Sequence, residues 1–279
     1  FPHSAIFNLK SHLPMLSTQT VGAVIVGAIG VGIGLAGASR IVSSHASPKY
    51  VLHVYDHCPF CNRVEFLMQN FEIPYDRVVY GYGAGADPDK CEGHGYGVGP
   101  VELTGKKMLP VLQGEGVPCA PGAVGMPESM EICSFLIARH QLVAPCESGR
   151  ADVKRFTEDL TKFKADLAEH RMIRMPVADW ADSRDVAYRR WKKKLPIEPP
   201  PVEPQPELIE KLNAKLAELP ALLKGGCCLN VWGWGMDDVV LLPLLRVFTC
   251  VKGVCLPPAV EKYLAFDASQ MTDYRRHAL

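Results

Sequence analysis

Apolar and polar positions in residues 50–140 follow the pattern of short buried strands alternating with helices. Residues 50–55 (YVLHVY) and 75–80 (YDRVVY) are rich in β-branched and aromatic residues, which predicts two strands. Residues 63–68 between them have a helical pattern, and residues 132–140 have another. This order predicts a mixed α/β domain over residues 50–140.

The second half of the chain has the spacing of amphipathic helices. In residues 152–170, apolar residues recur at intervals of three and four, which places them on one helix face that packs into a core. Residues 183–194 and 207–223 are also predicted helices, and a proline-rich stretch at 196–206 separates them. We therefore expect a helical domain over residues 150–279, joined to the first domain by a short link.

The first 49 residues include 18 consecutive residues without a charge, at positions 21–38. About 20 apolar residues cross the hydrocarbon core of a bilayer. Small residues recur there at four-residue spacing, which in lipid lets a second helix approach closely. A signal-peptide core and a glycine-rich linker are the competing interpretations. We expect a transmembrane helix at about residues 20–38, and a short polar tether after it within the segment 1–49.

Charge and cysteine content narrow the classes of function. Thirty Lys and Arg residues balance thirty Asp and Glu residues, so no basic surface argues for nucleic acid. Ten cysteines in 279 residues are too sparse and irregular for a disulfide scaffold, which favours reduced thiols in a reducing compartment. Asp237 and Asp238 precede an apolar helical stretch without a neighbouring Cys or His, so we expect them to cap a helix and predict no metal site.

The candidate chemistry begins with the stretch DHCPFC at residues 56–61. Cys58 lies at a predicted strand-to-helix turn, and Pro59 suits the first turn of a helix. The free N–H groups and the positive end of the helix dipole favour a thiolate at Cys58, whereas Cys61 lies one turn deeper and should be more buried. Half of a zinc site is the alternative, but no second Cys-x-x-Cys is present. We therefore favour a redox pair.

Two further stretches are predicted to lie near these thiols. The segment KKMLPVL at 106–112 is predicted to be a strand with an internal proline, where a cis bond between Leu109 and Pro110 is plausible. Glu128 and Ser129 stand in the first turn of a predicted helix, where free N–H groups hold a carboxylate or where the two residues simply cap the helix. A glycine-rich loop at 81–105 either covers the thiol site or docks elsewhere.

Together these motifs resemble the glutaredoxin 2 family of large two-domain glutaredoxins. The resemblance rests on four stretches in this order: YDHCPFC at 55–61, LPVLQ at 109–113, MPESM at 126–130 and LLPLLR at 241–246. It implies a thioredoxin-like N-terminal domain followed by a glutathione-transferase-like helical domain, here preceded by the transmembrane helix.

The resemblance also implies the roles of individual residues. Cys58 is the attacking thiol and Cys61 its resolving partner. Leu109, before the cis proline Pro110, pairs with the glutathione backbone. Glu128 and Ser129 hold the γ-glutamyl end of glutathione. Apart from the resemblance, His57 directly precedes the nucleophile and would tune the pKa of Cys58 if the ring were charged.

The implied function is glutathione-dependent thiol-disulfide exchange, with glutathione as co-substrate and protein disulfides or glutathionylated proteins as partners. The predicted anchor suggests a single-pass protein of an organellar membrane, either the mitochondrial inner membrane or the plastid thylakoid. An alternative is an accessory subunit of a large membrane complex, which contacts other subunits through the small-residue helix. A membrane-anchored prostaglandin synthase of glutaredoxin-like type ranks last, because its helical half matches less well.

Two other features have an ordinary interpretation and a functional one. The basic run at 189–194 (RRWKKK) is usually a solvated helix face, although it could contact phospholipid head groups or an acidic partner. Cys227 and Cys228 could trap an oxidised sulfur or a metal, but free cysteines are commonly small buried hydrophobes, which we favour here.

Overall fold

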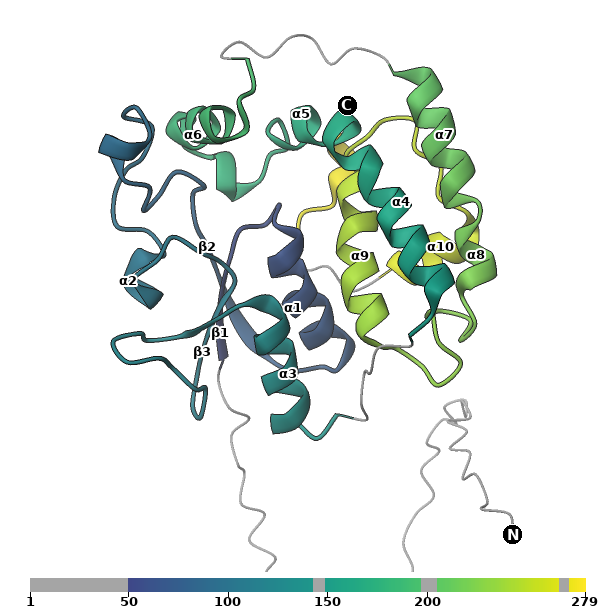
Figure 1. The fold of residues 1–279 in the computed structure, drawn as a ribbon, viewed down its shortest axis with the longest axis horizontal. Helices are drawn as coiled ribbons and strands as arrows, with labels where there is room; N and C mark the ends of the chain where they lie inside the picture. Colours follow the sequence, from purple (N-terminus) through teal and green to yellow (C-terminus); the bar gives the residue numbers. More distant parts are fainter. Residues whose placement is uncertain (1–49, 143–148, 197–204, 266–270) are drawn as a thin grey trace, which may run out of the picture. The chain divides into compact units, whose positions relative to one another are not determined.

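A computed structural model describes residues 50–142, 149–196, 205–265 and 271–279. Its sheet has the strand order β2-β1-β3-β4. The strands are β1 (Tyr50–Val54), β2 (Tyr75–Val79), β3 (Val111–Gln113) and β4 (Met126–Pro127). Strands β1 and β2 are parallel, whereas β3 runs antiparallel to both β1 and β4. Helices α1 (Pro59–Asn70) and α3 (Ser129–Arg139) pack together beside the sheet (Figure 1). The predicted mixed α/β part is thus confirmed.

Strand β1 is one of the two inner strands of this sheet, with a neighbour on each side. Four of its five residues are buried, as its nearly continuous apolar sequence predicts for an inner strand. Leu52 and Val54 of β1 lie in one apolar cluster with Leu67 of α1 and Ile132 of α3. This cluster fixes the carboxyl end of β1, where the chain turns into α1.

The rest of the described chain is mainly helical. Its helices are α4 (Ala151–Leu167), α5 (Glu169–Met172), η2 (Ala178–Trp180), α6 (Ser183–Lys193), α7 (Pro206–Leu216), α8 (Leu219–Leu222), α9 (Met236–Phe248), α10 (Pro258–Leu264) and η3 (Tyr274–His277). The predicted apolar stripe of the first helix is confirmed, because Val153, Phe156, Leu160 and Leu167 are all buried.

Helix α9 joins the helical part to the sheet part. It packs against α1 on one side and α4 on the other (Figure 1). Eleven of its residues are buried, as expected of a helix that is apolar on nearly all faces. Asp238 caps its first turn by accepting hydrogen bonds from the amides of Gly235 at 2.7 Å and Leu229 at 2.9 Å. The predicted capping role is therefore confirmed for Asp238.

Some element bounds differ from the sequence-based expectations. The strand expected from residue 106 begins only at Val111, because the chain before it turns through the cis peptide of Leu109–Pro110. The helix expected over 207–223 is two helices, α7 and α8, with Pro220 in the first turn of the second. The glycine-rich loop at 81–105 contains two short helices, η1 (Pro88–Lys90) and α2 (Val101–Thr104).

The expected transmembrane helix at about residues 20–38 lies outside the described residues. Among the helices that are described, none combines the length and the apolar character needed to cross a bilayer. The described residues all belong to one compact unit. The division into domains at 50–140 and 150–279 stays a prediction.

Candidate active site

Cys58 occupies the turn between β1 and α1, as predicted. It is the N-cap residue of α1, Pro59 follows it in the first turn, and its amide donates to the carbonyl of Tyr55 at 3.2 Å. Cys58 is partly exposed, whereas Cys61 is fully buried, which confirms the predicted difference in exposure. The sulfur of Cys61 accepts a hydrogen bond from the amide of Tyr55 at 3.4 Å. The thiol that solvent reaches is therefore Cys58.

The pKa values of the two thiols are shifted in opposite directions. A hydrogen bond from the Cys61 thiol lowers the pKa of Cys58, and the amides of Cys61 and Phe60 add to this effect against the opposing effect of burial. Burial and the neighbouring Cys58 sulfur raise the pKa of Cys61 well above its ordinary value. Cys58 is therefore the better nucleophile, and Cys61 remains a thiol that can donate to it.

His57 does not supply the positive charge considered from the sequence. Its ring is buried against Trp180 and its Nδ1 lies 2.6 Å from the Asp179 carboxylate. Burial lowers the pKa of His57 more than Asp179 raises it, so the ring is neutral at neutral pH. Asp179 also accepts hydrogen bonds from the amides of Asp56 and His57, each at 2.8 Å. A carboxylate of the helical part thus fixes the backbone just before Cys58.

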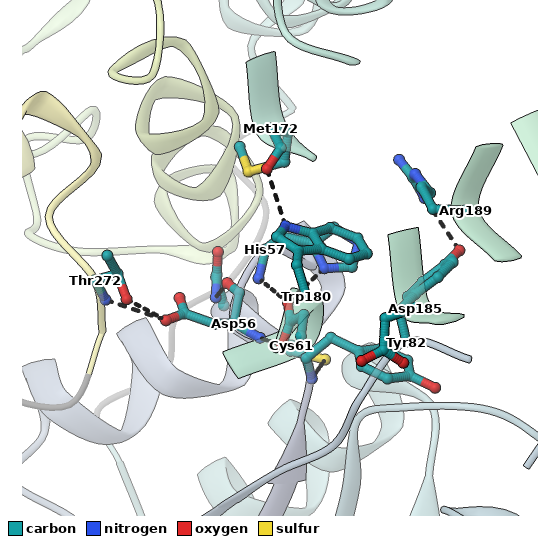
Figure 2. A network of polar contacts seen from close by, with 12 residues as sticks. Asp56, His57, Cys61, Tyr82, Met172, Trp180, Asp185, Arg189 and Thr272 are labelled. Carbon is teal, nitrogen blue, oxygen red and sulfur yellow. Dashed lines mark hydrogen bonds and ion pairs between the residues drawn. The ribbon is translucent and has the colours of Figure 1, made fainter. Parts of the chain in front are cut away.

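A buried charge network fixes the same turn from the other side. Arg246 of α9 donates to the Asp56 carboxylate at 2.5 Å and to the Asp56 carbonyl at 2.8 Å. It also donates to the side chain of Asn62 at 2.8 Å. The hydroxyl of Thr272 donates to the other oxygen of the same carboxylate at 2.6 Å (Figure 2). Arg77 lies 3.6 Å from Asp56 on the sheet side. The position of Cys58 therefore depends on contacts with the helical part.

Leu109, which precedes Pro110, lies beside Cys58. The peptide bond between Leu109 and Pro110 is cis, and Leu109 lines the same cavity as Cys58. Neither the N–H nor the C=O of Leu109 has a hydrogen-bond partner among the described residues. These groups are thus free to pair with an extended peptide.

Glu128 and Ser129 are close to this edge of the sheet, but they do not line the Cys58 cavity. Val111 pairs with Pro127, so continuation of the antiparallel register places Glu128 opposite Pro110. Glu128 is exposed and has φ of 72°, a conformation that residues other than glycine rarely adopt. Ser129 is buried at the first position of α3. The two residues are therefore candidates for a subsite adjacent to the cavity.

The cavity beside Cys58 has a volume of about 330 Å³ and a wall that the sequence did not predict. Residues from the sheet part, the glycine-rich loop and helices α4 to α6 contribute to it. The charged lining residues are Lys107, Lys164, Glu169, Arg189, Lys192 and Lys193. Three of them, Arg189, Lys192 and Lys193, come from the basic run of α6, so this run is not only a solvated face. Nothing in the spacing of the run indicated which of its members face Cys58.

The glycine-rich loop docks on the helical part. The Asp185 carboxylate accepts from the amide of Gly83 and from the hydroxyl of Tyr96, both at 2.7 Å. The amide of Tyr82 donates to the carbonyl of Asp179 at 3.0 Å. Tyr82 itself lines the cavity. The loop therefore adds a wall to the site while Cys58 keeps part of its exposure.

Lys107 holds this loop to the sheet part. Its ammonium donates to the hydroxyl of Tyr55 at 2.7 Å and to the carbonyls of Tyr82 at 2.6 Å and Ala84 at 2.9 Å. It also lies 5.1 to 5.3 Å from the ring centres of three tyrosines, in the range of cation–π contacts. Burial lowers the pKa of Lys107 to about 8. Lys107 was not among the residues expected from the sequence.

Of the adjacent pair Cys227 and Cys228, only one is the small buried residue that we expected. Cys228 is buried and its thiol donates to the carbonyl of Asn230 at 3.4 Å, as a small core residue does, whereas Cys227 is exposed. Among the described residues there is no cluster of three or more His, Cys, Asp or Glu side chains that could hold a metal ion.

One family model matches the helical part of the chain. Residues 152–275 match the model of the glutaredoxin 2 C-terminal domain. No curated protein sequence matches the chain significantly.

Several solved structures are similar to this chain. Glutaredoxin 2 from Salmonella typhimurium, solved in complex with glutathione, aligns over 82% of this chain and 99% of its own, with 22% identity and a TM-score of 0.65. A trimeric glutathione transferase from Leishmania aligns over 82% of this chain and 44% of its own, with 21% identity and a TM-score of 0.37. A glutathione S-transferase from the clam Laternula elliptica aligns over 77% and 86%, with 19% identity and a TM-score of 0.41. The described chain thus has the fold of the Salmonella glutaredoxin 2 structure, a thioredoxin-like part followed by a helical part.

Proposed function

We propose that this chain is a glutaredoxin of the glutaredoxin 2 family that catalyses glutathione-dependent thiol-disulfide exchange. The observation that carries the proposal is the partly exposed Cys58, whose pKa is lowered and which faces Leu109 with its free backbone groups. The Salmonella structure with the same fold contains glutathione. Its ligand supports glutathione as the co-substrate here.

Glutathione fits the surroundings of Cys58 in one extended arrangement. Its cysteine sulfur would lie at Cys58, and its backbone would pair with the free N–H and C=O of Leu109. Its γ-glutamyl carboxylate would then reach the first turn of α3 at Ser129, where helix N–H groups favour an anion. The positive φ of Glu128 supports a functional role, because such conformations cluster at ligand sites.

The reaction follows from the two thiols. The Cys58 thiolate attacks the glutathione sulfur of a mixed disulfide, a new S–S bond forms at Cys58, and the substrate sulfur leaves as a thiolate that takes up a proton. A second glutathione thiolate then attacks the same glutathione sulfur, which releases oxidised glutathione and restores Cys58. In the other route, Cys61 displaces glutathione and forms a Cys58–Cys61 disulfide.

Turnover of a glutathionylated peptide, coupled to glutathione reductase, tests this proposal. Cys58→Ser should remove the activity, whereas Cys61→Ser should keep the route that uses a second glutathione. Cys255→Ser is a matched control, since Cys255 is exposed and is not among the residues that line the cavity. Equal activity of the wild type and Cys58→Ser would end the proposal.

We further propose that the chain is anchored in an organellar membrane, the mitochondrial inner membrane or the plastid thylakoid. The uncharged residues 21–38, which lie outside the described residues, support this location. Their small-residue spacing also favours the alternative of an accessory subunit in a membrane complex. After gentle solubilisation, a large native-gel band without activity, unaffected by Cys58→Ser, would indicate the subunit. A small active band would indicate a tethered enzyme, and complete release from membranes by alkaline carbonate would contradict the anchor.

A further inference from the structure

The cavity beside Cys58 has a large excess of positive charge. One carboxylate, Glu169, is among its lining residues, against five cationic side chains. The cations are Lys107, Lys164, Arg189, Lys192 and Lys193. The whole chain has no net charge, so this excess is a local property of the cavity wall.

Some of these cations already have partners. Arg189 donates to the Glu169 carboxylate at 2.6 Å, and Lys193 lies 3.6 Å from its other oxygen. Lys107 is surrounded by three neutral oxygens. Lys164 and Lys192 remain without a carboxylate within ion-pair distance in the part of the chain that the structure describes.

The two unpaired lysines are placed to act on a bound molecule. Lys164 of α4 is partly buried in the wall. Lys192 of α6 lies 5.5 Å from the ring centre of Tyr82 and 5.8 Å from that of Tyr188, which keeps its ammonium at the cavity. A concave wall of one charge sign concentrates its field on the space it encloses, so an anion is attracted there.

We propose that this cavity binds the leaving half of a small carboxylate-bearing disulfide, with Lys164 and Lys192 pairing with its carboxylate. A volume of about 330 Å³ fits a small molecule and is at the lower end of ligand pockets. This inference names the substrate class of the proposed function and rests on it for the reactivity of Cys58. The predicted subsite at Glu128 and Ser129 lies outside the cavity lining and leaves the cavity free for the second half of the substrate.

In the step that this site serves, the Cys58 thiolate attacks one sulfur of the disulfide. A bond forms between Cys58 and that sulfur while the original S–S bond breaks. The leaving half departs with the electron pair as a thiolate, and it takes a proton from water. Its carboxylate and its developing thiolate both carry negative charge, which the unpaired lysines stabilise.

The test compares two disulfide probes with the full chain. The probe 5,5′-dithiobis(2-nitrobenzoate) carries carboxylates, whereas 2,2′-dithiodipyridine is neutral. The rate constants for their reaction with Cys58 are measured at low ionic strength, and the readout is the ratio of the anionic rate to the neutral rate. This ratio removes any effect of the lysines on the reactivity of the Cys58 thiolate itself. The wild-type background and every variant in this test carry serine in place of the exposed Cys119, Cys227 and Cys255. They also carry serine in place of Cys146, which lies outside the described residues.

Lys192→Gln should lower the ratio about threefold, and the double variant with Lys164→Gln should lower it about tenfold. Lys252→Gln, an exposed lysine that does not line the cavity, should leave the ratio unchanged. High salt should reduce the wild-type ratio toward that of the double variant. Because Lys192 is exposed, its single variant keeps the test valid if the double variant does not fold.

The proposed anion site is refuted if the ratio changes less than twofold in the folded double variant. If the double variant does not fold, the same limit applies to Lys192→Gln alone. This outcome would leave glutathione-dependent turnover untouched, so the proposed function would stand without it. Conversely, the variants could lower the ratio as expected while the wild type shows no glutathione-dependent turnover. This result would support the anion site and refute the proposed function. The two failures are therefore distinguishable.

Discussion

The substitution Arg246→Met tests whether the helical part holds the turn that carries Cys58. Arg246 is 3% exposed and donates to the Asp56 carboxylate, the Asp56 carbonyl, the Asn62 side chain and the Thr272 carbonyl. Methionine fills much of the same volume but leaves all these acceptors without this donor. Removal of one partner of a buried ion pair costs about 3–5 kcal/mol.

The free energy of unfolding from urea denaturation measures this loss. For a unit of this size, each kcal/mol lowers the melting temperature by about 2–4 °C, so the variant should melt roughly 10 °C lower. Arg155→Met is the matched control. Arg155 is exposed on α4, so this change should stay within about 0.5 kcal/mol of the wild type.

The pH dependence of the loss identifies its cause. Burial alone would raise the pKa of Asp56, but Arg246 and Arg77 outweigh it and hold this pKa below its ordinary value. The wild type therefore has the full stabilisation above the ordinary carboxyl pKa, near 4, and loses it as the pH falls through the lower pKa of the folded state. In Arg246→Met, burial raises the pKa of Asp56 relative to the wild type, so protonation relieves the buried charge at acidic pH. The destabilisation should therefore be larger at pH 7 than at pH 4. A loss below about 1 kcal/mol at pH 7, or one that grows on acidification, would refute the reasoning.

Cys58, Lys107 and Asp185 each have a property that can be measured. The rate at which iodoacetamide alkylates Cys58 should rise with pH through a midpoint below the ordinary thiol pKa, because Cys61 and the helix amides stabilise the thiolate. Mass spectrometry of the Cys58 peptide measures this rate. A midpoint above the ordinary thiol pKa would contradict the assignment. The free energy of unfolding should rise between about pH 8 and 10, because the folded state releases the Lys107 proton at about pH 8, below the ordinary lysine pKa. The urea midpoint of the wild type should rise over this pH range. The same rise in Lys107→Met would rule out Lys107 as its source. Asp185→Ala removes two of the hydrogen bonds that dock the loop at 81–105, so limited proteolysis should cut this loop several times faster. Asp166→Ala, on an exposed face of α4, serves as the control, and equal cleavage in both variants would show that Asp185 does not hold the loop.

The sequence predicted the parts of the site that depend on short segments. A strand followed by Cys-Pro-x-Cys is enough to place Cys58 at a helix start, because proline suits the first helical turn and the apolar run before it forms a strand. The cis bond before Pro110 and the buried stripe of α4 were also predictable, since both follow from neighbouring residues.

The supports of this site could not be predicted in the same way. Asp179 lies 123 positions from Asp56, and Arg246 lies 190 positions from it. In the sequence, these residues are ordinary charges among sixty. Their partners became apparent only when α9 and η2 were packed beside the turn, because hydrogen bonds depend on distance in space and not along the chain.

The basic run of α6 shows the same division between sequence and structure. The positive charge of residues 189–194 on a helix, and the start of another helix at Cys58, could both be predicted from the sequence, because composition and helical spacing are local properties. The packing of α6 beside the turn brings Arg189, Lys192 and Lys193 into the wall of the Cys58 cavity, and no local pattern predicts this. The capping of α6 by Asp182 and the docking of the glycine-rich loop on Asp185 set how this helix meets the sheet part. Which face of a helix meets a distant active site depends on such packing contacts, whose partners are far apart in the chain.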